Sequence, residues 1–197
     1  MAIHIENPQD EMKTCLFEGC SLHLYQKTLE INATDEKYQK NFNYYYRVRR
    51  DAAWLEQFYA YMDKNKNNKD ITFAEILRYL SNIEHTARKT AKNPTGKIKS
   101  VEASFASKML ATINQDHPIW DSQVLNKLGK KVDDKLCFED KIEACIRLYQ
   151  EIEEEIAEFI QSPNGQECIA LFDQEFPRGK KFSDFKKIDF YLWSLGK

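Results

Sequence analysis

The sequence has 197 residues, a formal net charge of −2 and an apolar fraction of 42%. These values exclude an intrinsically disordered chain, because there is enough apolar surface to build a core. They also exclude a chain that is basic throughout, although the segments 86–108 and 178–187 are locally basic. Such segments favour binding of a polyanion on one face, and the alternative is an ordinary surface of interspersed charges.

The cysteine content indicates a reducing environment. Five cysteines are present, no signal peptide precedes them, and no apolar run is long enough to cross a bilayer. We therefore expect a cytoplasmic protein without a membrane partner. Cys15, Cys20 and His23 resemble half of a metal site, but no second half follows, so we expect no metal and no cofactor. The oligomeric state is left open.

The first third of the chain divides into an irregular start and a helical region. We expect residues 1–33 to be irregular, with short apolar elements. From Thr34 to Lys64, apolar and aromatic residues recur at steps of three and four, which predicts one long helix or two helices with a break near Arg50. Residues 64–70 are polar and predict a loop.

The next predicted helix starts at a capping box. Thr72 and Glu75 are spaced so that each side chain can bond the other residue's backbone N–H. The apolar pattern that follows weakens near Arg88. Residues 92–100 then contain a proline, a glycine and several lysines, which predicts a basic turn.

Residues 104–129 indicate a helix, a polar turn and a second helix. In the first helix, Lys108 lies four residues from Ser104 on the face opposite the apolar one, so we expect a solvated lysine directed away from the core. In the second helix, Asp121 stands where an N-cap is expected, and Gly129 ends the apolar pattern. Taken alone, both positions are typical of surface and capping residues.

The remaining sequence predicts helices only. Residues 137–162 carry a strong amphipathic pattern, a short helix covers about 166–172, and a last helix begins at Ser183 and ends at Gly196. Helix follows helix without a run of alternating strands. The sequence therefore predicts one all-α domain over residues 1–197.

One part of the chain resembles a known family. The segments "ASK" at 106–108 and "PIWDSQVLNKLG" at 118–129 are similar to the core of helix-hairpin-helix DNA glycosylases. The whole chain also resembles bacterial proteins with an 8-oxoguanine DNA glycosylase-like fold, through "SFASKMLATI", "PIWDS" and "KKIDFYLW". The resemblance implies an orthogonal helical bundle whose core motif covers residues 98–130, and a hydrolase role in DNA repair or defence.

The resemblance also implies a site. Lys108 would be the catalytic nucleophile and Asp121 its electrostatic partner, with DNA or a nucleotide as the ligand. Cleavage of an N-glycosidic bond builds positive charge on the sugar, which a carboxylate stabilises, and a neutral amine can attack the sugar carbon. Contacts to nucleic acid are expected from five further residues, namely Lys97, Lys99, Ser107, Ser122 and Lys127.

Aromatic residues supply candidates for contact with an extruded base. Tyr44, Tyr45, Tyr46 and Trp120 are available for stacking or wedging, whereas aromatics at helical spacing are commonly core residues.

A second hypothesis needs no catalysis. The family's glycine-rich hairpin before the lysine is replaced here by "KIKSVEA" at 97–103. This favours a non-catalytic helical module that binds nucleic acid or a protein on a similar scaffold.

Overall fold

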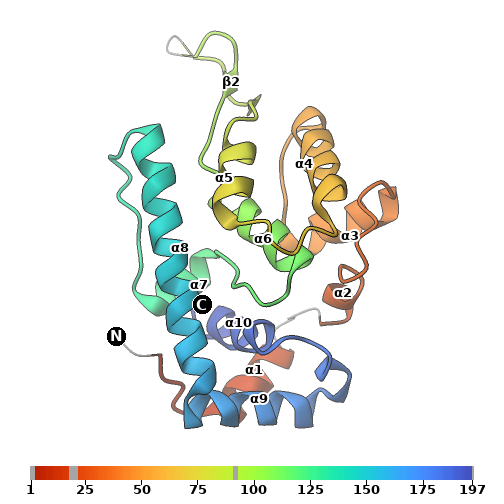
Figure 1. The fold of residues 1–197 in the computed structure, drawn as a ribbon, viewed down its shortest axis with the longest axis vertical. Helices are drawn as coiled ribbons and strands as arrows, with labels where there is room; N and C mark the ends of the chain where they lie inside the picture. The colour runs from red at the N-terminus through yellow and green to blue at the C-terminus, as the bar shows by residue number, and fades with distance from the viewer. Residues whose placement is uncertain (1–2, 18–21, 91–92, 197) are drawn as a thin grey trace.

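The computed structural model describes residues 3–17, 22–90 and 93–196 (Figure 1). The prediction of an all-α chain is confirmed for these residues, which form ten α-helices, one short 3-10 helix and one two-stranded hairpin. The α-helices are α1 (Pro8–Phe17), α2 (Leu22–Gln26), α3 (Glu36–Tyr46), α4 (Ala52–Asn65), α5 (Phe73–Ser81), α6 (Ala103–Ile113), α7 (Ser122–Leu128), α8 (Phe138–Gln161), α9 (Pro163–Glu175) and α10 (Asp184–Leu195). The hairpin pairs β1 (His85–Thr86) with β2 (Lys97–Ile98), and the 3-10 helix is η1 (Pro177–Gly179).

The beginning of the chain is more regular than expected. The prediction that residues 1–33 are irregular is wrong for the described part, because α1 and α2 lie within it. Helix α1 packs against α9 and α10. Its apolar residues are few and weakly periodic, so tertiary packing rather than an amphipathic pattern determines this helix.

The predicted break near Arg50 is confirmed, and it separates α3 from α4. Helix α3 ends at Arg47, whose backbone is left-handed with φ 52° and donates to the carbonyl of Asn43. Helix α4 starts at Asp51, whose side chain accepts from the backbone N–H of Trp54. The five residues from 47 to 51 therefore form a tight turn between two capped helix ends.

The region between α5 and α6 corrects the expected helix end. The capping box of Thr72 and Glu75 is confirmed, but α5 ends at Ser81 and the chain continues into the β1–β2 hairpin. The backbone N–H of Thr86 donates to Asp51 Oδ2 at 2.5 Å, which ties the hairpin to the start of α4. Of the predicted basic turn, residues 93–96 thus lie in the connection between the two strands, and Lys97 and Ile98 form β2.

Two groups of helices enclose the core (Figure 1). Helices α4, α5 and α6 lie at the end near the hairpin, whereas α1, α9 and α10 lie at the other end. Helix α8 runs along both groups and contacts α5, α9 and α10. Within the described ranges, no helix has both the length and the apolar composition needed to cross a membrane.

Candidate active site

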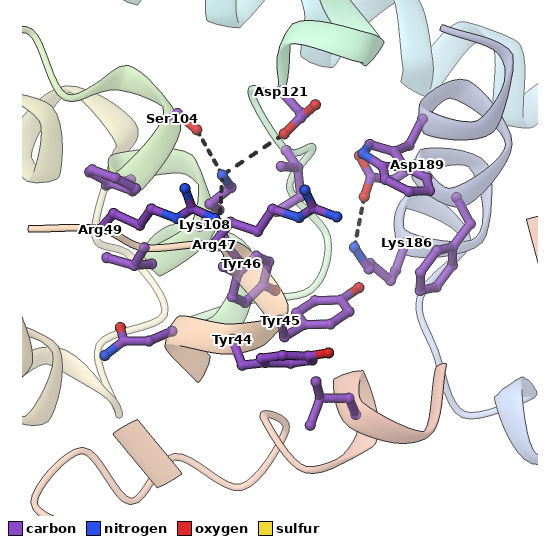
Figure 2. Close-up of a pocket in the computed structure, with 17 residues that line it drawn as sticks. Tyr44, Tyr45, Tyr46, Arg47, Arg49, Ser104, Lys108, Asp121, Lys186 and Asp189 are labelled. Carbon is purple, nitrogen blue, oxygen red and sulfur yellow. Dashed lines mark hydrogen bonds and ion pairs between the residues drawn. The ribbon is translucent and has the colours of Figure 1, made fainter. Parts of the chain in front are cut away.

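A cleft of about 970 Å³ opens between α3, α6, the start of α7 and α10. Figure 2 shows its side chains, with the turn after α3 on one side and α10 on the other. Both predicted catalytic residues, Lys108 and Asp121, line this cleft. A concave site with a few convergent polar groups is the usual form of a small-ligand site.

Lys108 does not point into solvent as expected. Only 7% of the residue is exposed, because α6 is packed on nearly all sides. The face that seemed polar instead meets the turn after α3. The amine donates to Ser104 Oγ at 2.9 Å and to the backbone carbonyl of Tyr46 at 3.3 Å.

The two carboxylate oxygens of Asp121 make different contacts. It is the predicted N-cap of α7, where Oδ1 accepts from the backbone N–H of Gln123 at 3.0 Å. Its other oxygen, Oδ2, lies 3.9 Å from the amine of Lys108. This separation is an ion-pair distance and exceeds a hydrogen bond, so a third position around the amine is not closed by a short contact.

Burial around Lys108 weakens the preference of its amine for the charged form. Burial lowers the pKa of Lys108 below its ordinary value, and the nearby carboxylate of Asp121 opposes this without reversing it. The two short contacts go to a hydroxyl and a carbonyl, both uncharged acceptors. A neutral amine can donate two hydrogen bonds to them and keep its lone pair.

A second lysine–aspartate pair lines the same cleft. Lys186 Nζ lies 2.7 Å from Asp189 Oδ2, and the side chains are 5% and 7% exposed. The carboxylate holds the pKa of Lys186 above its ordinary value despite burial, so we treat this amine as charged. The aromatic rings of Tyr25 and Phe190 lie under its ammonium group, at 4.8 and 4.6 Å.

Sequence reasoning missed this second pair. The only available signal was the i, i+3 spacing of a lysine and an aspartate in the last helix, which normally indicates a surface ion pair. Because α10 is buried on most of its faces, the pair lies at the wall of the cleft instead.

The four candidate aromatics have different environments. Tyr44 is 79% exposed at the rim of the cleft, and Tyr45 lines the cleft beside it (Figure 2). Tyr46 is a core residue, only 6% exposed. Trp120 is also buried, parallel to Phe73 with ring centroids 6.4 Å apart, so it cannot contact a ligand in this conformation.

The five residues predicted to contact nucleic acid do not line the cleft. Ser107 is fully buried and accepts from the backbone N–H of Trp120, so its prediction as a contact residue is corrected to a core role. Lys97 and Lys99 are exposed on the hairpin, where Lys99 donates to Asn82. Ser122 and Lys127 are exposed on α7.

Arg47 and Arg49 are cleft residues that sequence reasoning did not single out. Both lie on the turn after α3 and both are exposed. No signal marked them, because basic residues between two helices are common on protein surfaces.

No metal centre is formed within the described residues, where no three His, Cys, Asp or Glu side chains are grouped suitably. Cys15 and Cys20 of the expected half-site have side chains outside the described set. No protein-family model matches the chain, and neither the curated proteins nor the solved structures contain a significant match.

Proposed function

We propose that the protein is a DNA glycosylase-like enzyme that cleaves an N-glycosidic bond, with Lys108 as nucleophile and Asp121 as electrostatic partner. One observation carries the proposal: a desolvated amine lies 3.9 Å from a carboxylate, and both line one cleft. The resemblance to helix-hairpin-helix glycosylases supports the same pair and the same helical scaffold. Substrate and reaction are inferred from this chemistry.

The reaction begins with attack by the neutral amine. Lys108 Nζ forms a bond to the sugar C1′, and the bond from C1′ to the base nitrogen breaks, with its electron pair leaving on the base. The base takes the proton that the amine nitrogen must lose. Asp121 stabilises the positive charge that develops on the sugar during this step.

A Schiff base can then form on the same lysine. Opening of the sugar ring breaks the bond from C1′ to the ring oxygen, which takes a proton from solvent, and leaves a protonated imine between Nζ and C1′. Water hydrolyses the imine and regenerates the amine. The nitrogen of the protonated imine keeps one N–H, which can donate to Ser104 Oγ or to the Tyr46 carbonyl, the two acceptors of the free amine.

The competing candidate is a binding module without catalysis. It is favoured by the same two hydrogen bonds, because a purely structural lysine would be held in this way. In that case Lys108 joins the end of α3 to α6, and the cleft only binds its ligand.

Base release distinguishes the two. We expect wild-type protein to release a base from at least one member of a panel of damaged nucleosides, single strands and duplexes, measured by chromatography. Lys108→Gln abolishes this release, whereas Lys141→Gln, a lysine on α8 outside the cleft, leaves it intact. A wild-type protein that releases no base across the panel would favour the binding module.

A further inference from the structure

The end of α3 and the turn that follows it form an exposed surface at the mouth of the cleft. Tyr44, Arg47 and Arg49 line the cleft together and are all exposed. Tyr44, at 79%, is the most exposed large hydrophobic side chain in the described chain. Most tyrosines of this protein are buried, so an exposed tyrosine ring beside a cleft indicates a contact with a ligand or a partner.

The arginines of this turn differ in how their charge is used. Arg50 forms a bidentate ion pair with the buried Glu102, whose two carboxylate oxygens both lie 2.9 Å from Arg50 Nη2. Arg47 and Arg49 have no acidic partner among the residues that the structure describes. Two guanidinium groups at a cleft mouth are therefore available for an anion, and the planar guanidinium suits phosphate.

The basic surface continues beyond the cleft. Arg49 also lines a smaller recess of about 320 Å³, which it shares with Arg50, Asp51, His85 and Thr86. The one carboxylate there, Asp51, accepts from the backbone N–H groups of Trp54 and Thr86 and lies 4.0 Å from the amine of Lys97. His85 and Thr86 belong to the hairpin, and the exposed basic residues that the structure describes in and just after the hairpin are Arg88, Lys89, Lys97 and Lys99.

These features match one kind of ligand. A row of cations that passes an exposed aromatic ring is the arrangement that binds a single nucleic-acid strand, with bases stacked on rings and phosphates on cations. A paired duplex offers no free base face to Tyr44, whereas an unpaired strand does. We propose that this rim, formed by Tyr44, Arg47 and Arg49, binds an unpaired nucleic-acid strand, with one base stacked on Tyr44 and the adjacent phosphates on the two arginines.

The rim deepens the proposed function by naming its substrate class. It rests on that function only for what enters the cleft, since a strand held at the mouth presents one base toward Lys108 and Asp121. A free nucleobase would gain nothing from the arginines. The strand can be DNA or RNA, because both share the phosphodiester and the base face.

Fluorescence anisotropy with labelled oligonucleotides of about 12 nucleotides tests the rim. The probes are oligothymidylate, oligouridylate and a DNA duplex of equal length, and comparing the first two separates DNA from RNA. We expect wild-type protein to bind a single strand at least tenfold more tightly than the duplex. Tyr44→Ala weakens single-strand binding by about tenfold, whereas Tyr44→Trp, which keeps a stacking face, restores it.

The arginines are tested through salt dependence. Replacing both Arg47 and Arg49 with Gln should lower the slope of log affinity against log salt by about 1.4, since each phosphate contact on a single strand contributes about 0.7. The matched control replaces Lys131 and Lys135 with Gln, which removes the same charge from exposed positions outside the cleft and outside both basic segments. Equal slopes for the rim variant and the control would overturn the proposal, as would duplex binding equal to or tighter than single-strand binding.

Lys108→Gln separates this proposal from the proposed function. If the rim binds a strand and Lys108 is the nucleophile, this variant keeps single-strand affinity and loses base release. Rim variants that keep full affinity, in a protein that still needs Lys108 for base release, would refute the rim alone. Strand binding that depends on the rim, in a wild-type protein that releases no base, would support the rim and refute the proposed reaction.

Discussion

The substitution Asp121→Asn separates the two tasks of this side chain. Asparagine keeps an oxygen that can accept from the backbone N–H of Gln123, so the cap of α7 is retained. It removes the negative charge that lies 3.9 Å from the amine of Lys108. The variant therefore tests the charge of the carboxylate and leaves the helix start nearly unchanged.

The magnitude follows from the distance between the groups. A unit positive charge on the sugar at a similar distance from the carboxylate is stabilised by about 4 kcal/mol at an effective dielectric constant of 20. Because the Asp121 side chain is 25% exposed, solvent screens part of this energy. We expect kcat for base release to fall on the order of 100- to 1000-fold.

Two assays on the same samples decide the outcome. Single-turnover base release measures the chemical step, and urea denaturation measures the free energy of unfolding, which we expect to change by less than about 1 kcal/mol. Asp121→Ala is the comparison, because it loses the cap as well and should unfold about 1 kcal/mol more easily. An Asp121→Asn variant that retains a third or more of the wild-type rate would refute the electrostatic role.

Three further outcomes are expected. Base release should rise with pH to a plateau, and its midpoint should lie below the ordinary lysine pKa because burial lowers the pKa of Lys108. Asp121→Asn should move this midpoint to lower pH, because it removes the carboxylate that raises the pKa of Lys108. A rate of base release that does not change with pH would contradict a titrating amine. In urea denaturation, Lys186→Met should lower the free energy of unfolding by about 3–5 kcal/mol, since it leaves the buried Asp189 carboxylate unpaired. Adding Asp189→Leu to this variant should recover most of the lost stability. A Lys186→Met variant as stable as wild type would show that the ion pair of Lys186 and Asp189 does not form in solution. Asp51→Ala should lower the free energy of unfolding at pH 7, where Asp51 is ionised in both the folded and the unfolded state. The difference in unfolding free energy from wild type should shrink as the pH falls from 3.8 to about 2, because the backbone N–H groups of Thr86 and Trp54 lower the pKa of Asp51 to about 2 in the folded state. A difference that stays constant across this pH range would show that the Asp51 carboxylate does not stabilise the fold through these hydrogen bonds.

Local signals in the sequence were sufficient for much of the fold. The capping box at Thr72 and the caps at Asp121 and Ser183 define helix starts through bonds within three residues, and all are present. The break after α3 was also predictable, because Asp51 is a strong cap. Such features depend on neighbouring residues alone, so no tertiary information is needed.

Features that depend on tertiary packing were not predictable. Lys108 is expected in solvent because its helix has a polar face in the sequence, but the end of α3 lies against that face, and the carbonyl of Tyr46 accepts a hydrogen bond from the amine. The buried pair of Lys186 and Asp189 has the spacing of a surface pair. The burial of Lys108 and of the Lys186–Asp189 pair depends on segments distant in sequence, and the hydrophobic periodicity of a single helix does not indicate such contacts.

Reduction with borohydride during the reaction tests the central claim most directly. If the amine of Lys108 forms a Schiff base with the sugar, peptide mass spectrometry of the reduced protein places one sugar adduct on Lys108, and Lys186 in the same cleft stays unmodified because its amine is charged and paired. An adduct on any other lysine, or base release that proceeds at the wild-type rate in Lys108→Gln, would contradict the assignment of Lys108 as the nucleophile.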